Sequence, residues 1–196
     1  LSGDLNISAL EQAINAMVAR HEILRTSFRI EDGQPYQHIE NTLNVSLTTE
    51  TVSAENLAQT INEGIMQGLD LSQAPILRCK LYSLDSQQYV FVFVIHHIIT
   101  DGWSNVIFER EFLTCYQALS RGEEPSLPEM PVQFADYACW QREWLKDDVL
   151  NRQADYWSQQ LVGVPDRLEI PTDRPRPAML TTSGDHSGFV WSAEKR

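Results

Sequence analysis

The segment that most constrains the fold is Tyr89–Ile95, an unbroken run of tyrosine, valine, phenylalanine and isoleucine. These residue types favour β-strands, and a strand that is apolar on both faces belongs in the middle of a sheet. The run leads directly into His96 and His97, and an Asp-Gly turn follows at Asp101 and Gly102. We therefore expect a central strand that delivers two imidazoles to a turn.

The histidine pair indicates a catalytic site more than a metal site. Imidazole is the usual proton-transfer group near neutral pH, and side chains alternate along a strand. His96 and His97 should then point to opposite faces, one into a cleft and the other into the packed interior. Ligands on opposite faces cannot converge on one ion, so no metal is expected. The alternative is a pair of buried structural histidines, bonded to the backbone.

Composition excludes several classes of function. The 196 residues include 15 lysines and arginines against 27 acidic residues, which gives a formal net charge of −12. Such a surface repels phosphate backbones, so nucleic-acid binding is not expected. No window is long and apolar enough to span a membrane, and three scattered cysteines favour a reducing cytoplasm. Because the first residue is Leu1, we expect a piece of a longer polypeptide.

Hydrophobic periodicity predicts a chain of mixed α and β structure. Helices are expected over 7–20, 53–68, 104–119 and 134–161, with Asp147 and Asp148 as the candidate break in the last. The helix over 104–119 should direct six apolar side chains inward: Val106, Ile107, Phe108, Phe112, Leu113 and Tyr116.

Strands are expected over 24–30 and 35–39, joined as a hairpin through Asp32 and Gly33. Further strands are expected over 43–49, 76–84, 89–97 and 184–191. Prolines at Pro165, Pro171, Pro175 and Pro177 predict an extended connector that is not helical throughout.

Charged residues gather in 20–28, Arg-His-Glu-Ile-Leu-Arg-Thr-Ser-Phe, where the first helix is expected to end. Arg20 and His21 are explained by the negative end of the helix dipole. Arg25 is not, because arginine keeps its charge inside a protein and an inward-pointing guanidinium needs a carboxylate. Asp101 is the candidate partner.

Aromatic residues recur at helical spacing in 134–144, which begins Phe-Ala-Asp-Tyr-Ala-Cys-Trp. Such stripes belong to a core more often than to a ligand site. We interpret Trp140 as a packing residue that holds the site in shape.

Taken in order, these segments resemble the condensation domains of nonribosomal peptide synthetases. The family's His-His-x-x-x-Asp-Gly signature is met over 96–102, and its Arg-His-Glu-x-Leu-Arg-Thr-x-Phe segment over 20–28. Its aromatic-x-Asp-aromatic-Ala-x-Trp segment is met over 134–140, and the Pro-Thr-Asp-Arg-Pro-Arg-Pro run over 171–177 is also typical. The resemblance implies an α/β lobe of chloramphenicol-acetyltransferase-like fold, a mixed sheet flanked by helices. Residues 1–177 would be the N-terminal lobe without its first strand, and 178–196 a connector and the start of a C-terminal lobe whose remainder is missing.

The resemblance also implies amide-bond formation between a donor thioester and the α-amine of an acceptor aminoacyl thioester. His97 would be the catalytic residue, as general base or by positioning the amine, and His96 would support the fold behind it. Asp101, paired with Arg25, would hold the loop. Gly102 would permit a tight turn and admit the phosphopantetheine arm.

The implied partners are upstream and downstream peptidyl carrier domains, an adenylation domain of the same polypeptide and the missing C-terminal lobe. No cofactor would bind directly, since the substrates ride on phosphopantetheine, and the isolated piece should be inactive. Two alternatives remain: a non-catalytic condensation-like module that recruits a partner enzyme, or a related acyltransferase dependent on coenzyme A or a carrier. Such recruitment modules typically have a damaged histidine motif, whereas the motif here is whole.

Overall fold

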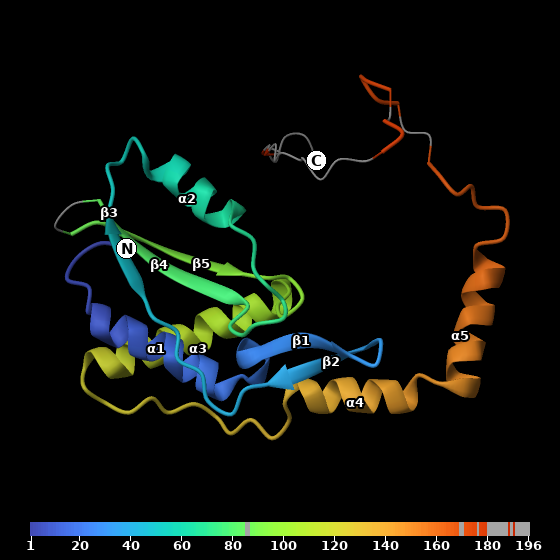
Figure 1. The fold of residues 1–196 in the computed structure, drawn as a ribbon, viewed down its shortest axis with the longest axis horizontal. Helices are drawn as coiled ribbons and strands as arrows, with labels where there is room; N and C mark the ends of the chain where they lie inside the picture. Colours follow the sequence, from blue (N-terminus) through green and yellow to red (C-terminus); the bar gives the residue numbers. More distant parts are fainter. Residues whose placement is uncertain (85–86, 169–170, 176, 180–187, 189, 191–196) are drawn as a thin grey trace. The chain divides into compact units, whose positions relative to one another are not determined.

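The computed structural model describes residues 1–84, 87–168, 171–175, 177–179, 188 and 190 (Figure 1). The chain divides into two units, Leu1–Lys146 and Asp147–Arg196. The lobe boundary expected at residue 177 falls inside the second unit and stays a prediction. Apart from residues 188 and 190, the strand expected over 184–191 lies outside the described residues.

A three-stranded sheet forms the centre of the first unit, in the order β3 (Thr48–Thr51), β4 (Leu77–Ser83), β5 (Tyr89–Ile95). β3 runs parallel to β4, and β4 runs antiparallel to β5. The expectation that the apolar run would be the central strand is therefore wrong for the described residues, where β5 lies at the edge. On its outer side, the backbone pairing seen in the described part of the chain is at the start, where Leu1 and Tyr89 exchange hydrogen bonds of 2.8 and 2.9 Å.

β5 is apolar throughout because both of its faces are covered. On one face, Phe91 stacks on Phe112 with ring centroids 5.7 Å apart, and Phe93 stacks on Phe108 at 4.8 Å. On the other face, Val92 and Val94 line a cavity beneath α2 (Leu57–Met66). Burial on two faces, and not a central place in the sheet, accounts for the composition of this strand.

Two helices, α1 (Ile7–Arg20) and α3 (Gly102–Ser120), cover one face of the sheet, and α2 lies over the other (Figure 1). α1 has the expected bounds and is capped by Asn6, whose side chain accepts a hydrogen bond from the Ala9 amide at 3.0 Å. The core between these helices and the sheet is made of buried apolar side chains: Leu10, Ile14, Met17, Val18, Leu77, Cys79, Leu81, Phe112 and Cys115.

The inward face of α3 differs from the expected one. Val106 and Leu113 were expected to point inward, but they are 68% and 45% exposed. A helix turns about 100° per residue, so a stripe through Phe108, Phe112 and Cys115 leaves both of them on the outer side. Glu111 falls on the inward stripe instead and is only 7% exposed.

The expected hairpin is confirmed: β1 (Thr26–Glu31) pairs antiparallel with β2 (Gln34–Ile39). Asp32 and Gly33 adopt φ angles of 50° and 77°, the left-handed geometry of a tight hairpin turn. The first strand begins later than expected, because a 3₁₀ helix, η1 (Glu22–Arg25), takes up its first residues.

Other boundaries also shift. β3 begins at Thr48, whereas a strand was expected from residue 43, and α2 begins at Leu57, whereas a helix was expected from residue 53. The Trp-rich region is two helices, α4 (Phe134–Trp144) in the first unit and α5 (Asp147–Gln160) in the second, so the break near Asp147 is confirmed.

After α5, the described residues up to 179 form no helix or strand, as the prolines predicted. No helix within the described ranges has the length and apolar character needed to cross a membrane.

Candidate functional site

A cavity of about 360 Å³ lies in the first unit at the C-terminal end of β5. Four segments form its walls: the junction of α1 and η1, the end of β5 with the loop after it, the first turns of α3, and the segment that leads into α4. This volume is in the range of small-molecule binding sites, which are commonly lined by apolar side chains with a few polar groups.

The side chain of His97 lines this cavity together with Phe93 and Ile95. These alternate positions share one face, so the strand's alternation carries through to His97 although β5 itself ends at Ile95. His96 is turned away from the cavity lining. Its Nδ1 accepts a hydrogen bond from the amide of Ile98 at 3.0 Å, which fixes the turn after the strand.

Asp101 begins α3 as its N-cap. Its carboxylate accepts hydrogen bonds from the backbone amide and the hydroxyl of Ser104, both at 2.7 Å. These bonds lower the pKa of Asp101, with a smaller contribution from the nearby imidazole of His97. Asp101 therefore holds the loop, as expected, but it does so through the start of a helix.

The expected pairing of Arg25 with Asp101 is wrong. The guanidinium of Arg25 donates to the backbone carbonyl of Glu40, and its Nη2 lies 3.3 Å from the carboxylate of Glu22. The reason is local: Arg25 belongs to η1 and not to a strand, and its side chain reaches the end of β2. Arg25 thus ties η1 to the hairpin.

Gly102 is not needed for a tight turn. It is the first residue of α3, its φ is not in the left-handed region, and an added Cβ would meet nothing within 4 Å. The second part of the expectation, that this position leaves room for a substrate arm, stays a prediction.

Trp140 lies outside the cavity wall. Its ring stacks on Trp144 at 5.5 Å and contacts Tyr137 at 5.7 Å, and the residue remains 54% exposed. The first aromatic of the same segment, Phe134, lines the cavity instead. Trp140 thus packs on its aromatic neighbours, while Phe134 forms the cavity wall, and a role of Trp140 in holding the site in shape stays a prediction.

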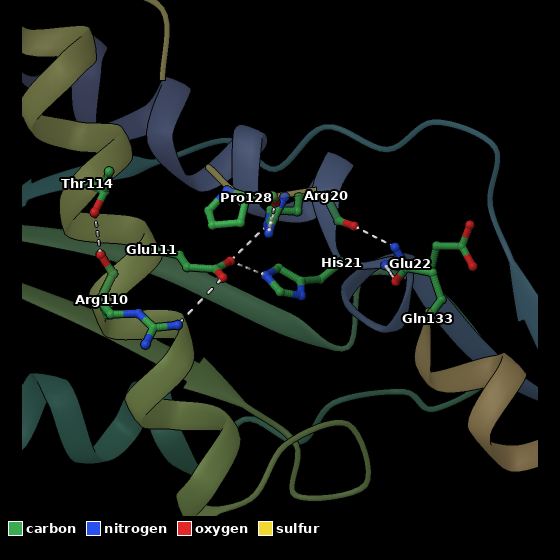
Figure 2. A network of polar contacts seen from close by, with 8 residues as sticks. All are labelled: Arg20, His21, Glu22, Arg110, Glu111, Thr114, Pro128 and Gln133. Carbon is green, nitrogen blue, oxygen red and sulfur yellow. Dashed lines mark hydrogen bonds and ion pairs between the residues drawn. The ribbon is translucent and has the colours of Figure 1, made fainter. Parts of the chain in front are cut away.

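A buried ionic network behind the cavity was not expected from the sequence (Figure 2). Oε2 of Glu111 lies 2.9 Å from Nε of Arg20 and 2.9 Å from Nε2 of His21. Burial raises the pKa of the Glu111 carboxyl, but hydrogen bonds from Arg20 and His21 outweigh it and hold the pKa below its ordinary value. A glutamate in an inward-facing helical position was the signal that could have revealed it.

The same network fixes the segment that leads into α4. Nη2 of Arg20 donates to the carbonyl of Pro128 at 2.7 Å, and the side chain of Gln133 donates to the carbonyl of Arg20 at 3.0 Å. Gln133 also accepts from the amide of Glu22 at 3.2 Å. These hydrogen bonds hold together cavity walls that come from distant parts of the sequence.

The cavity thus brings together two imidazoles, those of His97 and His21. Such groups accept, donate and transfer protons, so the arrangement suits the binding and deprotonation of an amine or alcohol. Among the described residues, no group of three or more metal-ligating side chains is gathered anywhere.

Comparisons with known proteins agree with this geometry. A family model described as Condensation domain matches residues 1–196. The chain is 41% identical over its whole length to a component protein of the linear gramicidin synthase of Brevibacillus parabrevis. It is 37% identical over 96% of its length to gramicidin S synthase 2 of Aneurinibacillus migulanus. The chain spans only 3% and 4% of those two proteins.

A solved structure, the complex of the X-domain and OxyB from teicoplanin biosynthesis, matches 91% of this chain at 34% identity with a TM-score of 0.83. The chain covers 40% of that X-domain chain. The likeness in fold confirms the expected α/β lobe with a mixed sheet flanked by helices.

Proposed function

Because the chain belongs to the condensation-domain family of nonribosomal peptide synthetases, we propose that it forms amide bonds. The donor is an acyl or peptidyl thioester, and the acceptor is the α-amine of an aminoacyl thioester. The amine attacks the thioester carbonyl, the new C–N bond replaces the C–S bond, and the donor's thiol leaves with a proton. The observation that carries this proposal is the placement of His97 on the wall of the cavity at the end of β5.

His97 is the proposed catalytic residue. An α-ammonium group has an ordinary pKa of about 7.7–8.0, so only a modest free energy is needed to deprotonate it near neutrality. An imidazole beside it can take the proton or orient the amine toward the carbonyl. The carboxylate of the neighbouring Asp101 accepts hydrogen bonds from Ser104, and these bonds stabilise the loop that carries His97.

The substrates reach the cavity on phosphopantetheine arms of an upstream and a downstream peptidyl carrier domain. An adenylation domain of the same polypeptide and a second lobe complete the proposed machinery, in the cytoplasm. No cofactor bound directly by the chain takes part in this proposal. The chain's own residues supply a wall, an imidazole and hydrogen-bonding groups.

The test is a single-turnover assay in a synthetase module that contains this chain, with both carrier domains loaded. We expect His97→Ala to lower the rate of dipeptidyl-carrier formation by roughly a hundredfold or more, the usual contribution of a positioned acid–base group. His38→Ala is the matched control, because His38 lies in β2 beside Glu40 and outside the cavity. Equal rates for His97→Ala and the wild type would reject the proposal.

The second candidate is a module that recruits a partner enzyme without catalysis. Its support is the likeness to the X-domain, which was solved in complex with OxyB. Under this alternative, His97→Ala would leave peptide formation by the module unchanged, while loss of the chain would abolish binding of the partner.

A further inference from the structure

His21 lies on the wall of the same cavity as His97, and its ring is held from behind. Its Nε2 is 2.9 Å from Oε2 of Glu111, and its side chain is only 19% exposed (Figure 2). The backbone of His21 ends α1, with its amide bonded to the carbonyl of Met17 at 2.9 Å. Both the backbone and one edge of the ring are therefore fixed.

The contact with Glu111 determines which ring nitrogen carries a proton. The pKa of Glu111 is held below its ordinary value, so at neutral pH this group is a carboxylate, which can only accept. Nε2 must then be the donor. The same carboxylate also pairs with Arg20, and Nη2 of Arg110 lies 4.0 Å from its other oxygen.

The other nitrogen, Nδ1, has no hydrogen-bond partner within the described ranges. It is also absent from the buried polar atoms that lack a partner in those ranges, so it is not fully buried, and His21 is one of the residues that line the cavity. On the cavity side, the titratable groups that face it are His97 and Asp101. An imidazole fixed by a carboxylate through one nitrogen presents the other nitrogen in a defined direction.

On the basis of the proposed function, we infer that Nδ1 of His21 accepts a hydrogen bond from an N–H group of the acceptor substrate. That group is either the α-ammonium or an amide of the pantetheine arm. His21 is then a substrate-binding residue, while Glu111 and Arg20 are positioning residues that act through it. A purely structural role would need the bond to Glu111 but not an acceptor at Nδ1.

The variant that separates these roles is His21→Gln. A glutamine amide can donate to Glu111 as Nε2 does, but it leaves no acceptor in the place of Nδ1. The matched control is His38→Gln, a histidine that also lies beside a carboxylate, with Nε2 3.3 Å from Oε1 of Glu40, but outside the cavity. Unfolding midpoints of both variants should match that of the wild type.

In the loaded module, we expect His21→Gln to lower kcat/KM for the acceptor by about tenfold or more, as for one lost hydrogen bond to a charged or amide group. Two acceptor substrates, one with and one without an arm amide, distinguish which N–H group donates to His21. If the loss persists with an aminoacyl methyl thioester, the α-ammonium is the donor. If it appears only with an aminoacyl N-acetylcysteamine thioester, the donor is the arm amide.

The ring itself gives a readout that does not depend on activity. In the synthetase module that contains this chain, with ¹⁵N-labelled histidine, long-range ¹H–¹⁵N correlation spectra should show His21 with its proton on Nε2, and Glu111→Gln should alter those shifts. A proton on Nδ1 in place of Nε2, or a kcat/KM for His21→Gln within twofold of the wild type, would overturn the inference. If His97→Ala still abolishes condensation, the proposed function survives that outcome; if neither variant has an effect, the proposed function fails as well.

Discussion

The guanidinium of Arg20 lies 2.9 Å from the carboxylate of Glu111, and this buried ion pair joins the last residue of α1 to the middle of α3. Both helices cover the same face of the sheet, and the cavity opens at the end of that face. The relative position of the helices therefore affects the wall on which His21 lies.

Removing the carboxylate should destabilise the protein strongly. We expect Glu111→Ala to lower the free energy of unfolding by about 3–5 kcal/mol, because it leaves Arg20, whose side chain is only 19% exposed, without its carboxylate partner. Urea unfolding followed by circular dichroism measures this change. Glu109→Ala, on the exposed side of the same helix, is the control, and equal losses for the two variants would contradict the account.

The same carboxylate should contribute to acid sensitivity. Its pKa in the folded state lies below the ordinary value of 4.5, so its stabilising effect is complete above pH 4.5 and is lost as the pH falls through the folded pKa. The difference in unfolding free energy between the wild type and Glu111→Gln should therefore shrink on acidification. A difference that stays constant from pH 6 to about pH 3 would count against the lowered pKa.

Arg25 and Asp101 should behave as independent residues. Each has partners of its own, Glu40 and Glu22 for Arg25 and Ser104 for Asp101, and none is shared. We expect the effects of Arg25→Ala and Asp101→Ala on unfolding free energy to add in the double variant. Clear coupling in a double-mutant cycle would instead support the ion pair between Arg25 and Asp101 that was expected from the sequence.

Glycine-to-alanine substitutions should have opposite signs at the two ends of α3. At Gly102, an added methyl group meets open space in helical backbone, so stability should rise by about 0.4–1 kcal/mol. At Gly122, φ is +72°, and Gly122→Ala should cost about 1–2 kcal/mol. Thermal unfolding of both variants tests this, and a destabilised Gly102→Ala would mean that the position is more constrained than its surroundings indicate.

Local pattern was sufficient for much of the fold. The apolar spacing predicted α1, the Asp32-Gly33 turn predicted the hairpin, and the acidic pair at 147–148 marked the helix break. Each of these depends on residues close together in sequence. The position of β5 at the edge depends on long-range pairing, which composition does not encode.

The position of a site residue could be predicted only where the alternation of side chains along a strand determines it. His97 could be placed because it continues the positions of Phe93 and Ile95 on one face of a strand. His21 was attributed to the helix dipole, because its approach to Glu111, 90 residues away, exists only once α1 packs on α3. Arg25 was misplaced because a four-residue 3₁₀ turn has no strong sequence signature.

The exposed outer edge of β5 should affect the tendency of the chain to aggregate. Beyond the contact between Leu1 and Tyr89, no strand covers that side within the described residues. Exposed strand edges offer backbone donors and acceptors to other molecules, and they favour aggregation through intermolecular β-pairing. Expression of these residues by themselves should therefore require conditions or fusion partners that suppress self-association.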